Sequence, residues 1–293
     1  MNCLGKLLDG YRTIAFMGIY KNVGKTTTFN HVIRYYHEIA ANIALTSIGR
    51  DGEDMDILTG TKKPNIYVPK GSMIVTAEKL LALSGITLEI HKTTDIITPM
   101  GKIVFVRARS GGFVQLGGAP SNELNRLICE ILFDFGIKKI LIDGAFARKS
   151  LASPSLADAV ILSTGASFSP CIDTVVQHTV HCVNMMNLPI CSDPDAVYLP
   201  GAVTDRYICR MLHNKDGQIF VANDPSRVLI SSETYKKLIM RGNRLMVREK
   251  AQLVAVTVNP ISPKGYGFEA AAFLRRMRNE VDLPVFDVVS SCN

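Results

Sequence analysis

The sequence predicts an α/β fold in which a doubly wound, mostly parallel sheet lies between two layers of helices. The chain alternates between short apolar runs and longer segments whose apolar residues recur with helical spacing. Several apolar runs are continuous, such as residues 140–142 and 160–162. A strand has this composition when helices cover both of its faces, because neither row of side chains meets water. These two observations favour a three-layer α/β/α architecture.

The elements can be assigned in order along the chain. The predicted strands lie at residues 13–17, 43–48, 103–108, 138–143, 158–163, 252–258 and 284–289. The predicted helices lie at residues 25–40, 76–84, 121–135, 171–186, 232–241 and 267–279. Ser121 is a suitable N-cap for the third of these helices, and Gly136 a suitable stop after it.

Residues 190–230 differ from the rest of the chain, because prolines punctuate short strand-like pieces there. We interpret this segment as an insertion or small subdomain. The expected organisation is therefore one domain, residues 1–293, that carries this insertion.

The composition indicates a globular protein, since 47% of the 293 residues are hydrophobic and 20% are charged. No apolar run approaches the roughly 20 residues that span a bilayer, and the N-terminus lacks the apolar core of a signal peptide. The seven cysteines are scattered and odd in number, which suits reduced thiols better than disulfides. We therefore expect a cytoplasmic protein without a membrane partner.

The chain is basic, with a formal net charge of +7. Its Lys and Arg residues are nevertheless spread along the sequence, without a basic run or interleaved aromatic residues. This distribution argues against nucleic acid as the main partner and suits a surface that meets polyanionic ligands.

Residues 18–26 carry the most specific motif. They read Gly-Ile-Tyr-Lys-Asn-Val-Gly-Lys-Thr, which fits G-x-x-x-x-G-K-[ST] at every fixed position. A predicted strand precedes the motif and a predicted helix follows it. The free N–H groups of the first helical turn then point at a bound anion, and the helix dipole favours negative charge. Gly18 and Gly24 would let the backbone wrap closely around phosphates.

The motif assigns roles to single residues. Lys25 is expected to reach the β- and γ-phosphates, and Thr26 to offer its hydroxyl to Mg²⁺. The other residues expected to contact the phosphates are Gly18, Lys21, Asn22, Val23, Gly24 and Thr27. The expected ligands are ATP and Mg²⁺, with ATP preferred because the sequence has no N-K-x-D guanine motif.

Carboxylates follow two other predicted strands. Asp143 ends the strand at residues 138–143 and could hold Mg²⁺ directly or through water, although an ordinary Asp-Gly turn would look the same. The segment 49–56 carries a cluster of carboxylates, of which Asp51 lies nearest a strand end. Asp51 would ligate the metal or help to place the nucleophile, unless this is a solvated acidic loop. The expected catalytic residues are thus Lys25, Asp51 and Asp143.

These elements together resemble the dethiobiotin-synthetase-like branch of P-loop NTPases, which includes relatives of the nitrogenase iron protein. Residues 22–28 are similar to the loop of dethiobiotin synthetase, and Asp143 stands where its acidic-Gly-Ala element has Glu. The resemblance implies that Asn259 contacts the nucleotide base, and by analogy that the chain dimerises. The chain departs from the branch at Tyr20, where MinD-type loops have Lys. It also lacks the Lys-Pro pair that dethiobiotin synthetase carries after its second strand, so dethiobiotin chemistry itself does not carry over.

A weaker resemblance carries a more particular expectation. Residues 98–102, 111–120 and 259–268 resemble proteins associated with clostridial-type amino-acid fermentation. Some of those proteins are thought to reactivate cobalamin-dependent aminomutases by ATP-driven cofactor exchange. This implies a nucleotide-dependent switch that acts on a partner protein. The alternative is a ligase or small-molecule kinase that phosphorylates a carboxylate or hydroxyl.

Two further patterns leave alternatives open. The four residues Cys171, His178, His181 and Cys182 could hold a metal, but a helix whose histidines have structural partners explains them better. The Gly-rich residues 110–118 could form either a mobile loop or a tight hairpin.

Overall fold

The computed structural model describes residues 3–48, 66–144, 156–212 and 216–290. The central strands are β1 (Thr13–Gly18), β2 (Ile43–Ser47), β4 (Met73–Ala77), β5 (Leu88–Thr98), β6 (Gly101–Ala108), β8 (Lys139–Asp143), β9 (Ala159–Gly165), β15 (Gln252–Asn259) and β16 (Val285–Asp287). The helices around them are α1 (Cys3–Leu7), α2 (Lys25–Glu38), α3 (Glu78–Leu81), α4 (Asn122–Asp134), α5 (Ile172–Met186) and α8 (Ala270–Glu280).

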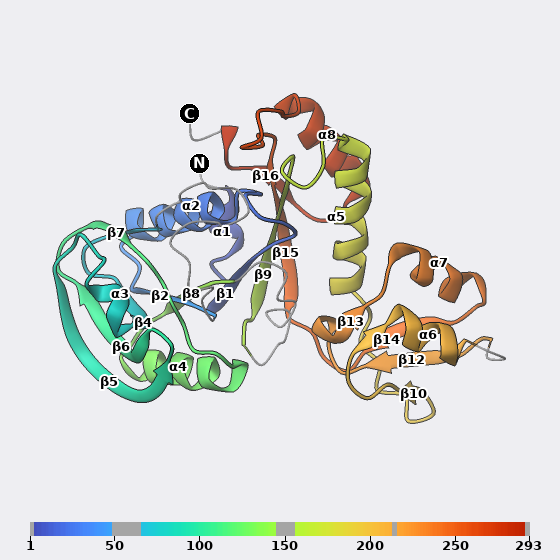
Figure 1. The fold of residues 1–293 in the computed structure, drawn as a ribbon, viewed down its shortest axis with the longest axis horizontal. Helices are drawn as coiled ribbons and strands as arrows, with labels where there is room; N and C mark the ends of the chain where they lie inside the picture. The colour runs from blue at the N-terminus through green and yellow to red at the C-terminus, as the bar shows by residue number, and fades with distance from the viewer. Residues whose placement is uncertain (1–2, 49–65, 145–155, 213–215, 291–293) are drawn as a thin grey trace.

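These strands form one nine-stranded sheet in the order β16-β15-β9-β1-β8-β2-β4-β6-β5 (Figure 1). All neighbours from β16 to β4 are parallel, whereas β6 runs antiparallel to both β4 and β5. The predicted α/β class with a large, mostly parallel sheet is confirmed.

Two apolar cores lie on the two faces of this sheet. Along β1, Ile14 and Phe16 belong to one core, and Ala15 and Met17 to the other, because successive side chains of a strand point to opposite faces. Helices α1 and α2 cover the first face, and α4, α5 and α8 cover the second. All six residues of β1 are buried, which explains why its sequence is a continuous apolar run.

All seven predicted strands are present, with boundaries that differ by one or two residues. The helix predicted at residues 76–84 was wrong at its start, because residues 76 and 77 end the buried strand β4. The sequence analysis missed β4 and also the edge strand β5. Side chains of β5 are largely exposed, so this strand lacks the continuous apolar pattern of the central strands.

The Gly-rich segment forms a long-range pairing instead of a local hairpin. Its residues Gly112–Val114 make strand β7, which pairs antiparallel with β3 (Ile66–Val68). Further along, Gly118 passes so close to the backbone of Ser47 that any Cβ would collide with the Ser47 carbonyl oxygen. Gly118 therefore allows a close backbone approach at the end of β2.

A small α/β unit lies between the end of α5 and the start of β15. Its parallel three-stranded sheet has the order β10-β12-β14. Its elements are β10 (Val197–Tyr198), β11 (Val203–Thr204), α6 (Asp205–Met211), β12 (Ile219–Ala222), the 3₁₀ helix η2 (Pro225–Arg227), β13 (Val228–Leu229), α7 (Ser232–Met240) and β14 (Arg244–Val247).

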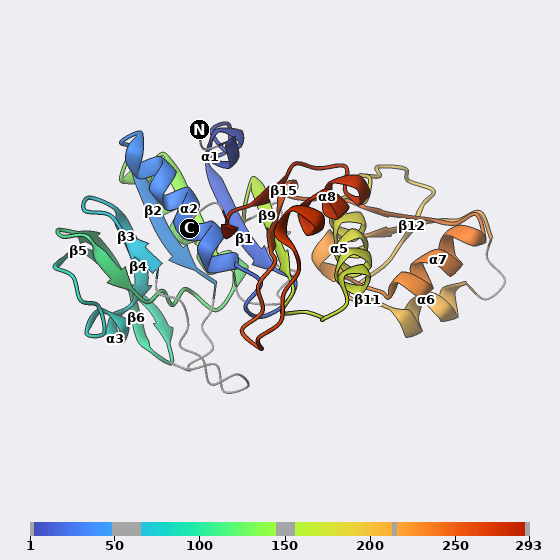
Figure 2. The same cartoon turned by 90° about the horizontal axis from the view of Figure 1, so that it is seen from above.

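The small unit has a core of its own, built around buried residues such as Phe220, Leu238 and Leu245. It extends past residue 230, the boundary expected from the sequence, because α7 and β14 complete its core. Figures 1 and 2 both place this unit at one end of the molecule and the β5–β6 hairpin at the other. Among the described residues, no helix is both long and apolar enough to cross a membrane.

Candidate functional site

The motif at residues 18–26 lies at the centre of the sheet, between the carboxyl end of β1 and the start of α2. Strand β1 has β8 on one side and β9 on the other, both parallel to it. Their carboxyl ends therefore meet at the same edge. In open α/β sheets, ligands bind at this edge where the strand order reverses.

The loop backbone takes left-handed conformations at two residues, Asn22 (φ 59°) and Gly24 (φ 86°). Gly24 also has little space, because a Cβ there would lie 3.1 Å from the Cβ of Asn259. Both constraints favour glycine at this position. Val23 between them is buried, so its expected contact with phosphate would come from its backbone.

Helix α2 begins without a side-chain cap on its N-cap residue, Gly24. Its first intrahelical hydrogen bond runs from the N–H of Thr28 to the carbonyl of Gly24, at 2.9 Å. The N–H groups of residues 25–27 consequently have no acceptor within the helix. Such a helix start can bind an anion through its amides and its dipole.

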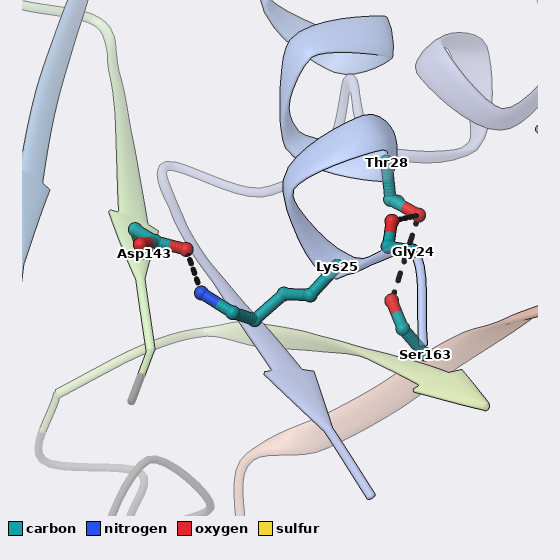
Figure 3. A network of polar contacts seen from close by, with 5 residues as sticks. All are labelled: Gly24, Lys25, Thr28, Asp143 and Ser163. Carbon is teal, nitrogen blue, oxygen red and sulfur yellow. Dashed lines mark hydrogen bonds and ion pairs between the residues drawn. The ribbon is translucent and has the colours of Figure 1, made fainter. Parts of the chain in front are cut away.

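Two of the expected catalytic residues meet in the structure. The ammonium group of Lys25 forms an ion pair with Oδ1 of Asp143 at the end of β8 (Figure 3). The two side chains are only 19% and 18% exposed, so solvent screens their attraction less than it would at an open surface. Figure 3 shows the Lys25 side chain extending away from the helix start toward β8.

The remaining expected phosphate contacts are residues of the loop and of the first turn of α2. Lys21, Asn22, Thr26 and Thr27 are all partly exposed. Thr26 is the second residue of α2. Its hydroxyl and the Asp143 carboxylate are oxygen ligands of the kind that Mg²⁺ prefers, with phosphate oxygens and water completing the shell.

Asp51, the third expected catalytic residue, lies outside the described residues, as does the rest of segment 49–56. In the part of the chain that the structure describes, no three His, Cys, Asp or Glu side chains group closely enough to hold a metal. Of the three residues expected to hold Mg²⁺, the structure describes Thr26 and Asp143.

Asn259 lies against the loop, and each end of its side-chain amide forms a hydrogen bond with a backbone group. Its Nδ2 donates to the carbonyl of Asn22 at 3.1 Å, and its Oδ1 accepts from the N–H of Ile261 at 3.0 Å. The hydroxyl of Ser167 also donates to the Asn22 carbonyl, at 2.9 Å. Asn259 thus supports the loop, while its expected contact with a nucleotide base stays a prediction.

The sequence analysis missed three buried hydroxyl residues beneath the loop, Thr28, Ser163 and Thr257. The oxygens of Thr28 and Thr257 lie 2.9 Å apart, as do those of Ser163 and Thr257. A signal for them existed. Ser163 and Thr257 are polar residues in the last two positions of predicted strands that are otherwise mostly apolar. A hydroxyl group needs a hydrogen-bond partner when it is buried.

The Cys/His cluster on α5 has structural partners. Nε2 of His181 lies 2.9 Å from the carbonyl oxygen of Ile230 in the small unit. The ring of His178 stacks on Phe168, and its Nε2 lies 3.7 Å from the sulfur of Cys182. These contacts support the structural interpretation of the cluster.

Comparison of the chain with family models, curated proteins and solved structures found no match. The assignment to a P-loop branch therefore stays a prediction based on the motifs.

Proposed function

We propose that the chain binds and hydrolyses Mg-ATP, and that hydrolysis drives a conformational change that acts on a partner protein. One observation carries this proposal. The uncapped start of α2 and the Lys25–Asp143 ion pair lie together at the carboxyl edge of the sheet. A site of this kind offers backbone amides, a cation and a carboxylate to a metal-bound phosphate.

Each residue has a role in this proposal. The amides of residues 25–27 bind phosphate oxygens, and the Lys25 ammonium moves from Asp143 to the terminal phosphates. Asp143, released from Lys25, would hold Mg²⁺ together with Thr26. Lys25 then stabilises negative charge that develops during transfer, which preorganised cations do efficiently in a partly buried site. Mg²⁺ would add charge neutralisation at the phosphates. Asp51 is proposed to ligate the metal or to help place the attacking water.

The partner is proposed from the resemblance to proteins of clostridial-type amino-acid fermentation. The first candidate is a cobalamin-dependent amino-acid mutase. The small unit supports action on a partner, because its separate core gives the chain a second folded body beyond the phosphate loop. Homodimerisation and a cytoplasmic location are parts of the same proposal.

Phosphate release by the purified protein tests the activity. We expect hydrolysis of Mg-ATP that falls about 100-fold or more in Lys25→Ala, because the variant loses a charge aimed at the phosphates. Lys237→Ala is the matched control, since Lys237 forms an exposed ion pair with Glu233 on α7. Equal loss in both variants, or full activity in Lys25→Ala, would contradict the proposal.

The same assay separates the two functional hypotheses. Hydrolysis that proceeds without metabolites favours the switch, and its rate is then measured with and without a cobalamin-dependent aminomutase. Turnover that requires one fraction of a metabolite pool favours the ligase or kinase, and that fraction contains the substrate.

A further inference from the structure

Three buried hydroxyl groups lie directly beneath the phosphate loop. They belong to Thr28 on α2, Ser163 on β9 and Thr257 on β15. Ser163 and Thr257 are register partners in neighbouring parallel strands, so the sheet holds their side chains together. Helix α2 brings Thr28 onto this pair.

The direction of each hydrogen bond follows from counting protons, since a hydroxyl donates only one. The hydroxyl of Thr28 lies 3.1 Å from the carbonyl oxygen of Gly24, which can only accept, so Thr28 donates there. At the 2.9 Å contact between Thr28 and Thr257, Thr257 must therefore donate. At the 2.9 Å contact between Thr257 and Ser163, the donor must then be Ser163.

The result is a directed chain from Ser163 through Thr257 and Thr28 to the Gly24 carbonyl. The direct contact between Ser163 and Thr28, drawn in Figure 3, is the longest of the three hydroxyl contacts at 3.5 Å. It adds little, because the Ser163 proton is already used at Thr257. Thr257 is the central link, which both accepts and donates.

We propose that this hydroxyl chain positions the phosphate loop by fixing the peptide plane between Gly24 and Lys25. The carbonyl of Gly24 and the N–H of Lys25 belong to one planar trans peptide, in which they point in opposite directions. Holding the carbonyl toward Thr28, along the axis of α2, therefore directs the Lys25 N–H out of the helix start, to the expected anion. Thr257 is the positioning residue. This inference rests on the proposed nucleotide site.

The hydroxyl chain reinforces the hydrogen bond that the Thr28 N–H already donates to the Gly24 carbonyl at 2.9 Å. Glycine populates several backbone regions with similar energy, and the left-handed conformation seen here is one of them. Three consecutive bonds from two strands restrict it to the conformation that serves the site. A chain that only satisfied buried hydroxyls would stabilise the fold without changing anion affinity.

Nucleotide titration of Thr257→Val tests the proposal. Valine has nearly the same shape but neither donates nor accepts, so the chain breaks at its centre. We expect the dissociation constant for Mg-ATP to rise about tenfold, the effect of one buried hydrogen bond. Thr257→Ser keeps the hydroxyl and should stay within about threefold of the wild type. Ser163→Ala, which breaks only the first link, should give an intermediate loss.

Thr179→Val is the matched control. Thr179 is also buried, donates to the carbonyl four residues earlier in its helix, and contacts another hydroxyl, that of Thr164, at 2.7 Å. It lies on α5, remote in sequence from the loop. Its valine variant should bind Mg-ATP as the wild type does. Equal weakening in Thr179→Val and Thr257→Val would overturn the proposal.

Hydrogen exchange without nucleotide separates this inference from the proposed function. The Thr28 amide is bonded to the Gly24 carbonyl, so peptides covering residues 24–30 should exchange about fivefold faster in Thr257→Val. Peptides from β8 should be unchanged. If the wild type failed to bind ATP but hydrogen exchange was faster in Thr257→Val as expected, only the proposed function would be wrong. If exchange and affinity both stayed at wild-type values, the positioning role would be wrong.

Discussion

The start of α2 differs from the helix starts of the small unit. In the small unit, the side chain of Thr204 accepts the N–H of Tyr207 at the start of α6, and Ser231 accepts the N–H of Thr234 at the start of α7. At α2, the N-cap is Gly24, which has no side chain to do this. A side-chain cap occupies one of the first N–H groups of a helix, whereas no N-cap side chain occupies those of α2.

The two sheets differ in the same sense. In the main sheet, β8 supplies Asp143 to Lys25, and β9 and β15 supply the hydroxyls beneath the loop. In the small unit, the parallel strands have only two to four residues, and their helices close on one core. The comparison teaches that parallel α/β packing alone does not make a site. The site needs an uncapped helix and charged or polar side chains from neighbouring strands.

Among the variants that test this comparison, the largest effect is expected for Asp143→Asn, which keeps the shape of the side chain but removes its charge. Loss of an outer-shell partner lowers the metal affinity of a site roughly 10- to 100-fold. We expect the Mg²⁺ affinity to fall by at least this factor in Asp143→Asn. Hydrolysis rates measured against Mg²⁺ concentration check this. Asp173→Asn is the control, because Asp173 on α5 forms an exposed ion pair with Arg276 on α8. An unchanged Mg²⁺ dependence in Asp143→Asn would remove the metal role from this residue.

Gly24→Ala sharpens the comparison by adding a Cβ at a left-handed position. We expect a loss of about 1–2 kcal/mol in unfolding free energy and weaker Mg-ATP binding, because the loop must shift away from Asn259. Gly201→Ala is the matched variant in the small unit, since Gly201 is also left-handed (φ 74°) but has open space around it.

Urea unfolding and nucleotide titration measure the two effects of these glycine variants. Both variants should lose similar stability from backbone strain, and only Gly24→Ala should lose affinity. Weaker nucleotide binding by Gly201→Ala would show that the two regions are not independent.

The smallest effect is expected for Ser231→Ala, which removes the cap of α7. It should cost about 1 kcal/mol of stability and leave Mg-ATP binding unchanged, because α7 belongs to the small unit at one end of the molecule. Ser231→Gly should cost only a few tenths of a kcal/mol, since glycine is tolerated at N-caps. Thermal unfolding in parallel with nucleotide titration checks both variants. A cap mutation that altered binding would indicate coupling between the small unit and the phosphate loop.

Periodicity was informative for the buried strands β1 and β9, but it missed the edge strand β5 and also the buried strand β4, whose last two residues were assigned to a helix. The strand β5 is half exposed and pairs through two register shifts, so no simple pattern marks it. The small unit was recognised only in part, because its strands are too short to show a period.

Local pattern was sufficient for the alternating architecture, the loop between β1 and α2 and the carboxylate at the end of β8, because each depends on a few consecutive residues. The ion pair joins residues 25 and 143, and the hydroxyl chain joins residues 28, 163 and 257. Neither follows from spacing along the chain. Parallel strands bring their carboxyl ends to one edge whatever their separation in sequence, so strand order decided which side chains meet there.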